Sequence, residues 1–349
     1  MEGMFYSTQS VWTWWIAIYL FLGGLGGAAV VISCLANMYC IRQYKQVALW
    51  GNISAFVMLS VGSLFLFIHL LDHIAVIHVL NPLGLLTKPD AWIMWGTQFI
   101  VWMMVWSMVF TLPFMLETPF WRDMPVVGTV LGWFGWLAKL SLKFHKLVGW
   151  LAIINGLGTV FYTGLLLQSF PGVALWHNPG VPLLFIVSAF STAIAFLLLV
   201  LYLIIKADEE NERLRTILER SDVILIGVEL MIIFVFFHFT TTGLESARYT
   251  AQILWNDMGW IIGFIGFGLI VPFLIEFKGV TKGWNSAAPI VLAAVLVLCG
   301  GYLLRHYFMY AGIYERPYPA VNSIIEHSQA QPAPIVDKVA ILKRQQVEG

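Results

Sequence analysis

The stretch that decides the fold is YTGLLLQSFPGVALWHNPGVPLL, residues 162–184. It begins inside one long apolar run and ends inside the next, with Pro171, Trp176, His177 and Asn178 between them. An apolar run of about 20 residues is long enough for a helix to cross a lipid bilayer. The stretch therefore indicates a corner at a membrane surface, where the chain leaves one spanning helix and enters another.

Runs of the same kind recur along the whole chain. We expect eight spanning helices, near residues 12–34, 48–71, 92–116, 148–169, 181–205, 222–243, 258–276 and 287–308. Of the 349 residues, 60% are hydrophobic and 11% are charged, whereas about 25% of a soluble protein is charged. The net charge of zero gives no electrostatic footprint for nucleic acid. The sequence predicts an all-α integral membrane protein embedded in a lipid bilayer.

Basic residues predict the orientation of these helices. Lysine and arginine gather in the connections after the first, third, fifth and seventh spans, whereas the opposite connections hold only Lys88 and Arg248. Connections on the cytoplasmic side of a membrane carry an excess of lysine and arginine. We therefore expect a multi-pass protein of the cytoplasmic (inner) membrane, with both termini outside the cytoplasm and residues 162–184 on the outer side.

The segment at about 126–146 does not fit the pattern of a span. Its apolar part, residues 126–138, is too short to cross a bilayer. Lys139, Lys143 and Lys146 then fall on one helical face. Apolar residues combined with a basic face are typical of a helix that lies in the membrane interface, and we predict such an interfacial helix here.

Four pairs of short motifs suggest an internal duplication. Each pair occurs in the same order in the two halves: GGLGGA (23–28) and SAFSTA (188–193), FLFIH (65–69) and FVFFH (234–238), LPFMLE (112–117) and VPFLIE (271–276), YTG (162–164) and YAG (310–312). The offset is an even number of spans, so the halves share one orientation, as in transporters built from parallel repeats. We expect two similar four-helix bundles, residues 1–170 and 171–312, and a polar C-terminal tail, 313–349.

The small residues at 23–28 and 188–193 predict close helix packing. Glycine, alanine and serine let helix backbones approach closely within a membrane. The string at 23–28 lies inside a span and follows no strand, which excludes a phosphate-binding loop.

Ionisable side chains are costly within a membrane and by default suggest function. His69, Asp72 and His73 end the second predicted span. The two histidines are four residues apart and share a helical face, with the aspartate beside both. Because histidine changes charge near neutral pH, this group is arranged for proton exchange.

A second set of ionisable residues indicates a path for protons through the membrane. Its candidates are Glu229, His238, Glu117 and Glu276, together with His73. Simpler roles remain open for three of them: Glu117 and Glu276 as solvated helix ends, and His238 as a packing residue.

The chemistry that suits titratable groups at one membrane face is that of a quinone. Its ring needs an apolar, aromatic slot, its oxygens need hydrogen-bond partners, and its protons need a titratable exit. We predict Tyr162, His69 and Asp72 as the catalytic residues. Three residues of the following loop complete the predicted quinone site: Trp176, His177 and Asn178.

Two other functions compete with this one. A membrane cytochrome b would need axial haem ligands facing each other across a bundle, and His69 and His238 are the available pair, although both lie towards the outer face. A secondary transporter would also use duplicated bundles, but no span is visibly broken at its centre. Cys34, Cys40 and Cys299 form no ligand cluster, so we expect no iron–sulfur cluster and no metal site in this chain.

Residues 145–195 carry a resemblance to a known family. Tyr162-Thr163-Gly164-Leu165, then Pro171, Trp176 and Asn178, then PLLF at 182–185 and Ser188-Ala189 resemble the signature of the NrfD/polysulfide-reductase membrane-subunit family. The chain departs from the family pattern by inserting His177. Of the family's Asp-Leu-Gly-Arg-Pro motif it keeps only Asp72.

The resemblance implies an eight-helix membrane anchor without haem, which binds quinone or quinol, menaquinone in particular. Its implied partners are a ferredoxin-like iron–sulfur subunit and, beyond it, a molybdopterin catalytic subunit or a multihaem cytochrome. Tyr162 and Asp72 match the positions that the family places near its quinone. Some relatives are proposed to translocate protons. Such a protein is a quinone-interacting subunit of a respiratory oxidoreductase and not catalytic alone.

Overall fold

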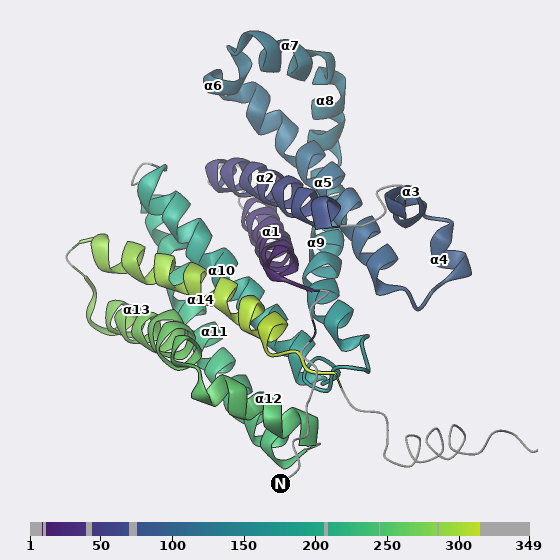
Figure 1. Ribbon diagram of the computed structural model, residues 1–349. Helices are drawn as coiled ribbons and strands as arrows, with labels where there is room; N and C mark the ends of the chain where they lie inside the picture. The colour runs from purple at the N-terminus through teal and green to yellow at the C-terminus, as the bar shows by residue number, and fades with distance from the viewer. Residues whose placement is uncertain are drawn as a thin grey trace, which may run out of the picture.

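The computed structural model describes residues 9, 12–39, 44–69, 75–205, 209–243, 245–284 and 286–314. In this part of the chain, eight helices are long and apolar enough to cross a membrane (Figure 1). They are α1 (Trp14–Tyr39), α2 (Lys45–His69), α5 (Trp92–Glu117), α9 (His145–Gln168), α10 (Gly180–Leu203), α11 (Glu209–Thr242), η1 (Gly259–Ile270) with α13 (Val271–Lys282), and α14 (Ala288–Tyr310). Each coincides with a predicted span, and the eight-helix prediction is confirmed.

Shorter helices occupy the connections. They are α3 (Ala75–Leu80) and α4 (Gly84–Thr87) before α5, α6 (Pro119–Arg122), α7 (Pro125–Trp133) and α8 (Gly135–Lys143) before α9, and α12 (Glu245–Asn256) before η1. Helices α6 to α8 form the top of the molecule in Figure 1. We call the membrane end at which α2 meets α3 the α3 end, and the opposite one the α8 end. The basic residues predict that the α8 end faces the cytoplasm.

The segment at 126–146 differs from the single helix that we predicted. It forms α7 and α8, whose axes meet at 58°, followed by the start of α9. The break falls at Phe134, whose ψ of 11° is not helical. Gly132 and Gly135 flank this residue, and glycine weakens a helix interior.

Helix α1 lies at the centre of the bundle and packs against α2, α9, α10 and α14. Its glycines allow this. A Cβ atom on Gly27 would lie 3.0 Å from the carbonyl oxygen of Gly156 on α9, and one on Gly24 would lie 3.2 Å from the Cβ of Ala189 on α10. The prediction that the small residues mark close helix packing is confirmed.

The remaining spans form two groups around this centre. Helices α2, α5 and α9 pack with α1, whereas α10, α11, α13 and α14 pack with one another. The two groups meet where α10 contacts α9 and where α14 contacts α1. The internal duplication and the boundary at residue 170 stay predictions.

The seventh span begins as a π-helix of 12 residues, η1. Asp257 caps it, because its Oδ1 accepts hydrogen bonds from the backbone N–H groups of Gly259 (2.8 Å) and Trp260 (3.2 Å). The same oxygen accepts a bond of 3.0 Å from the hydroxyl of Tyr307 on α14. Since π-helical turns are rare and frequently occur at functional sites, this span is a distinctive feature of the second group.

Candidate functional site

A cavity of about 280 Å³ opens between α1, α2, α3 and α5 near the α3 end. Residues three or four apart on α2, such as Ser60, Ser63 and Phe67, form one wall, and Ile93, Thr97 and further residues of α5 form another. Such spacing places side chains on one helical face. The cavity is lined mainly by apolar side chains, and its volume is just below the range for small-ligand pockets, about 300–1,000 Å³.

Helix α3 closes the cavity from the side. Its residues Val76, Val79 and Leu80 face the space. The side-chain amide of Gln98 on α5 donates a hydrogen bond of 2.9 Å to the carbonyl oxygen of Leu80. This bond attaches the end of α3 to α5 and so maintains the wall.

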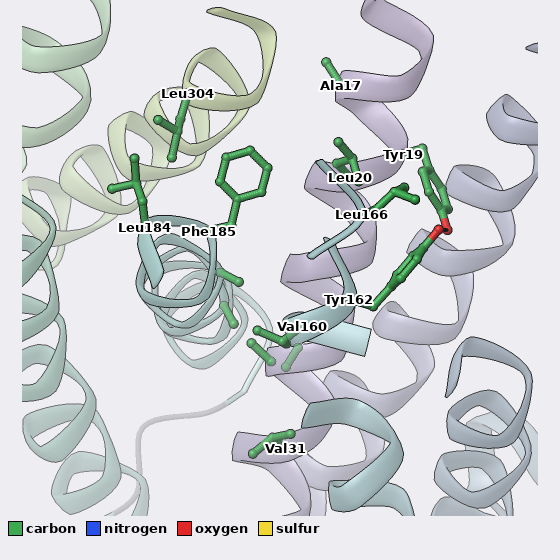
Figure 2. Close-up of a cluster of buried hydrophobic side chains, with 14 of the residues drawn as sticks. Ala17, Tyr19, Leu20, Val31, Val160, Tyr162, Leu166, Leu184, Phe185 and Leu304 are labelled. Atoms are coloured by element: carbon green, nitrogen blue, oxygen red, sulfur yellow. Dashed lines mark hydrogen bonds between the residues drawn. The ribbon is translucent and has the colours of Figure 1, made fainter. Parts of the chain in front are cut away.

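One tyrosine lines the cavity, and the predicted Tyr162 lies behind it without being part of the wall. Tyr19 of α1 lines the cavity, and its hydroxyl lies 3.3 Å from the hydroxyl of Tyr162 on α9. Figure 2 shows the two rings meeting hydroxyl to hydroxyl. Both side chains are buried. The Tyr162 ring occupies the space beside Gly96, where a Cβ atom would overlap the ring.

The hydroxyl groups around the cavity differ in whether they can donate a hydrogen bond to a bound molecule. The hydroxyls of Ser60 and Thr97 donate to the carbonyl oxygens of Phe56 and Ile93 in their own helices. Two tyrosine hydroxyls that share one hydrogen bond retain one O–H group for another acceptor, and 3.3 Å is long for a bond between hydroxyls. The tyrosine pair can therefore donate to a carbonyl oxygen placed in the cavity.

The predicted histidine–aspartate group lies partly outside the described residues. His69 is the last residue of α2, two positions after Phe67 of the cavity wall. Asp72 and His73 belong to the segment 70–74, which joins α2 to α3 and is outside the described residues.

The three predicted loop residues make contacts within the protein. The indole N–H of Trp176 donates a hydrogen bond of 2.7 Å to the carbonyl oxygen of Phe308 on α14. Asn178 Oδ1 accepts from the backbone N–H of Gly180 at the start of α10 (2.8 Å). His177 is exposed, and its Nδ1 lies 2.7 Å from the carbonyl oxygen of Gln168. These contacts attach the loop to α14 and to the first residue of α10. None of the three residues lines the cavity.

A second polar cluster lies inside the other group of helices. It consists of four buried ionisable residues, Asp222 and Glu229 on α11, Glu276 on α13 and Arg305 on α14. Asp222 Oδ1 accepts a hydrogen bond of 2.7 Å from the hydroxyl of Ser191 on α10. Asp222 and Glu276 also interact with each other.

Arg305 connects this cluster to the first group of helices. Its Nη1 donates to the Ser188 hydroxyl (2.7 Å) and its Nη2 to the carbonyl oxygen of Phe185 (3.2 Å). Glu229 interacts with both Arg305 and Ser188. A Cβ atom on Gly24 of α1 would lie 3.6 Å from Arg305 Nη2 and 3.9 Å from the hydroxyl oxygen of Thr163. The guanidinium thus lies near Gly24 of α1, and the Thr163 hydroxyl of α9 lies near the same glycine.

The other predicted proton-path residues lie elsewhere. Glu117 forms an ion pair of 3.5 Å with Lys45, in which both side chains are about half exposed. His238 is exposed on α11. Of the described members of the predicted path, the structure brings Glu229 and Glu276 into one cluster and leaves these two outside it.

Sequence reasoning missed three residues of these sites. Tyr19 is a polar side chain in the apolar run that precedes the glycines of α1, which was an available signal. Asp222 is the first residue of the predicted span 222–243, where an acidic side chain is typical of a solvated helix end. Arg305 stands near the end of the predicted span 287–308, and its burial follows from contacts with α10.

Comparisons with known proteins agree on one family. The family model described as NrfD, polysulphide reductase, matches residues 2–315. The chain is 27% identical to Protein NrfD of Escherichia coli over 335 residues, 88% of this chain and 96% of that protein. It is 25% identical to one of the chains of the polysulfide reductase of Wolinella succinogenes (86% and 94% covered). It is 24% identical to one of the subunits of the selenate reductase of Mesobacillus selenatarsenatis (78% and 69% covered).

Proposed function

Since the chain belongs to the NrfD family of multi-pass membrane subunits of respiratory reductases, we propose that it exchanges electrons between the quinone pool and an iron–sulfur partner. The observation that carries this proposal is the apolar cavity lined by Tyr19, whose hydroxyl meets that of Tyr162 behind the cavity wall. The subunit is not catalytic alone, because the two-electron chemistry needs a partner that accepts or supplies electrons.

The cavity residues suit a quinone head group. A quinone takes up two electrons and two protons when it becomes a quinol. The apolar walls of α2, α3 and α5 would hold the ring, and Tyr19, supported by Tyr162, would donate a hydrogen bond to a ring oxygen. His69 and Asp72 would exchange protons with the surroundings at the α3 end. The resemblance to the family implies that the quinone is menaquinone.

The partners follow from the family. Two of the relatives are named as parts of larger reductases, one of polysulfide and one of selenate. For this protein we propose a ferredoxin-like iron–sulfur subunit on the outer side of the cytoplasmic membrane, connected to a molybdopterin catalytic subunit or a multihaem cytochrome. Both termini of the protein would lie on that side.

The buried cluster supports a further part of the proposal, a route for protons through the second group of helices. The neighbouring polar side chains of this cluster form one sequence through the helices: Glu276, Asp222, Ser191, Glu229, Ser188 and Arg305. Its Arg305 end approaches Thr163, next to Tyr162. Ionisable residues within spans commonly mark proton relays, and this sequence would connect the cavity with the α8 end.

The haem-binding alternative has less support. A haem within a bundle needs two ligands that face each other, whereas His238 is exposed on α11 and His69 ends α2 in the other group of helices. A secondary transporter is disfavoured by membership of a family of reductase subunits.

The quinone proposal is tested by removing the tyrosine hydroxyls. We expect the variant Tyr19→Phe with Tyr162→Phe to lower kcat for a short-chain menaquinol analogue about 100-fold in the complete purified complex, because the donor to the ring oxygen is lost. Gly96→Ala should raise KM, because the new methyl group displaces the Tyr162 ring. Steady-state kinetics measure both effects.

Two controls separate the site from general damage. Tyr310→Phe removes the hydroxyl of an exposed tyrosine and should leave kcat and KM unchanged. Trp176→Phe should lower the melting temperature without raising KM, because its N–H bonds to α14. Unchanged kcat and KM in the double tyrosine variant would refute the quinone site.

A further inference from the structure

A polar cavity of about 400 Å³ lies at the α8 end of the second group of helices. Glu212, Thr216, Glu219 and Arg220 of α11 line one side, and Trp284, after α13, lines another. Helix α11 has 34 residues and is about 51 Å long, whereas the hydrocarbon core of a bilayer is about 30 Å thick. Five of the residues 209–215 at its start are charged, and charged side chains are costly in the core. We therefore place the first turns of α11 outside the core, where water would reach this cavity.

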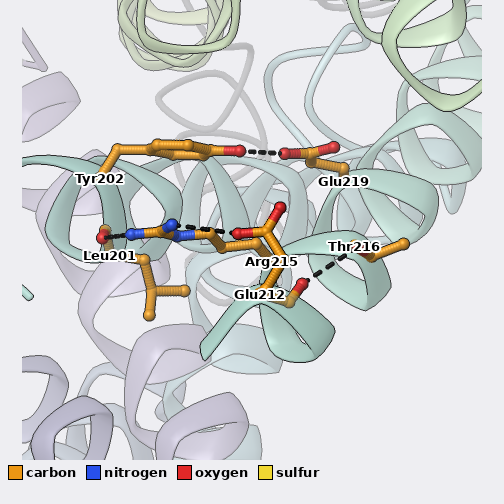
Figure 3. A network of polar contacts seen from close by, with 6 residues as sticks. All are labelled: Leu201, Tyr202, Glu212, Arg215, Thr216 and Glu219. Atoms are coloured by element: carbon orange, nitrogen blue, oxygen red, sulfur yellow. Dashed lines mark hydrogen bonds and ion pairs between the residues drawn. The ribbon is translucent and has the colours of Figure 1, made fainter. Parts of the chain in front are cut away.

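One side chain of the cavity wall is held in a defined position. The hydroxyl of Tyr202 on α10 donates a hydrogen bond of 2.7 Å to Glu219 Oε1 (Figure 3). The guanidinium of Arg215 lies over the Tyr202 ring, 4.4 Å from its centroid. Arg215 is itself bound to the carbonyl oxygen of Leu201 and to Glu212. The orientation of Tyr202, and through it that of Glu219, is set by this network.

Glu219 also lies beside the buried cluster. It stands three residues, about one helical turn, before Asp222 on α11, and Gly279, which lines the same cavity, stands three residues after Glu276 on α13. Both carboxylate oxygens of Glu276 are buried and have no hydrogen-bond partner among the described residues. Glu219 thus lines the polar cavity and lies about one helical turn from the buried acids.

From this placement we infer that Glu219 is the residue through which protons enter or leave the buried acids at the cytoplasmic end, and that Tyr202 and Arg215 are its positioning residues. This inference rests on the proposed function. A proton moves from water in the cavity to the Glu219 carboxylate and then to the Glu276–Asp222 pair, or in the opposite direction. The quinone couple exchanges its own two protons at the α3 end, through His69 and Asp72, and its two electrons with the iron–sulfur partner. The protons that pass Glu219 cross the membrane in addition to these two.

The test uses the complete complex in proteoliposomes, with Glu219→Gln and the control Glu245→Gln. Glu245 is an exposed glutamate in the first turn of α12 and lies outside the cavity wall and its network. We expect Glu219→Gln to lower kcat for the menaquinol analogue and the rate of proton transfer about 100-fold at unchanged KM. Azide, a small weak acid, should restore turnover when added on the cavity side. Glu245→Gln should be insensitive to azide and close to the parent protein.

Other results would overturn the inference and identify what failed. Parent-like proton transfer in Glu219→Gln, combined with slow transfer in Glu229→Gln, would place the entrance elsewhere and leave the route intact. A low kcat that azide does not restore, with a lowered melting temperature, would make the Tyr202–Glu219 network a clamp between α10 and α11. Failure of the proposed function itself is recognised separately, because the double tyrosine variant would then keep full quinol turnover.

Discussion

At the scale of single residues, the decisive feature is a guanidinium buried among helices. Arg305 is fully buried and donates to Ser188, to Phe185 and, at 2.8 Å, to the carbonyl oxygen of Gly301. Glu229 is the carboxylate that interacts with it. A buried charge whose partner is removed is strongly destabilising, whereas replacing both members of a pair can be nearly neutral. Arg305 and Glu229 therefore depend on each other.

This dependence predicts a non-additive result. Glu229→Gln alone, which leaves the Arg305 charge without its carboxylate, should lower the free energy of unfolding by about 3–5 kcal/mol. Arg305→Met combined with Glu229→Gln should recover most of this loss. Urea unfolding in detergent measures both, and Arg248→Met, at an exposed position on α12, is the control. A loss in the double variant equal to the sum of the losses in Glu229→Gln and Arg305→Met would show that the two residues are not coupled.

At the scale of elements, the bent segment formed by α7 and α8 differs most from expectation. Leu131 and Ala138 pack with Leu112 of α5 in a small core of their own. The side chains of Trp133 and Trp136 are exposed by 71% and 65%. Tryptophan and lysine together are typical of the membrane interface. We therefore expect the bent segment to lie at the lipid headgroups and not to cross the bilayer.

A fluorescent label at Trp133→Cys, in a variant without other cysteines, tests this depth. Lipids that carry a quencher near the headgroup should quench the label more than lipids that carry it near the end of the acyl tail. Leu64→Cys, at an exposed position within α2, should show the reverse order. If the quencher near the end of the acyl tail quenched the label at position 133 more strongly, the bent segment would instead enter the bilayer core.

At the scale of the whole molecule, the distribution of charge predicts which end faces the cytoplasm. Lys88 lies between the second and third spans, whereas Lys278 lies near the end of the seventh. The α3 end would then present the apolar cavity, the proposed quinone site, to the outer side, and the α8 end would open the polar cavity to the cytoplasm. The direction of any proton route follows from this orientation.

Cysteine labelling in intact cells checks the orientation. In a background without other cysteines, Lys88→Cys should react with a membrane-impermeant maleimide added outside. Lys278→Cys should react only after the membrane is opened. The reverse pattern would mean that the protein is inverted in the membrane. Labelling of both positions from outside would mean that α7 and α8 together cross the bilayer, because only the later position would change side.

The spans could be predicted from the sequence because the match between an apolar run and the bilayer thickness is a local property. The same holds for the close packing of the glycines in α1, since small residues act wherever helices meet. Tyr162 and Glu229 were recognised as candidates because polar groups in apolar runs are conspicuous. A comparison of motifs also indicated the family, which the match over residues 2–315 establishes.

Only the tertiary structure decided which of these side chains meet. Tyr19 lies 143 residues before Tyr162, and Ser188 lies 117 residues before Arg305. Such contacts depend on how far each helix is rotated about its axis and where it crosses its neighbours. A shift of one residue along an α-helix changes the direction of the side chain by about 100°. The sequence by itself thus determined the number and nature of the helices, whereas their packing decided that Trp176 anchors a loop and that Tyr19 faces the cavity.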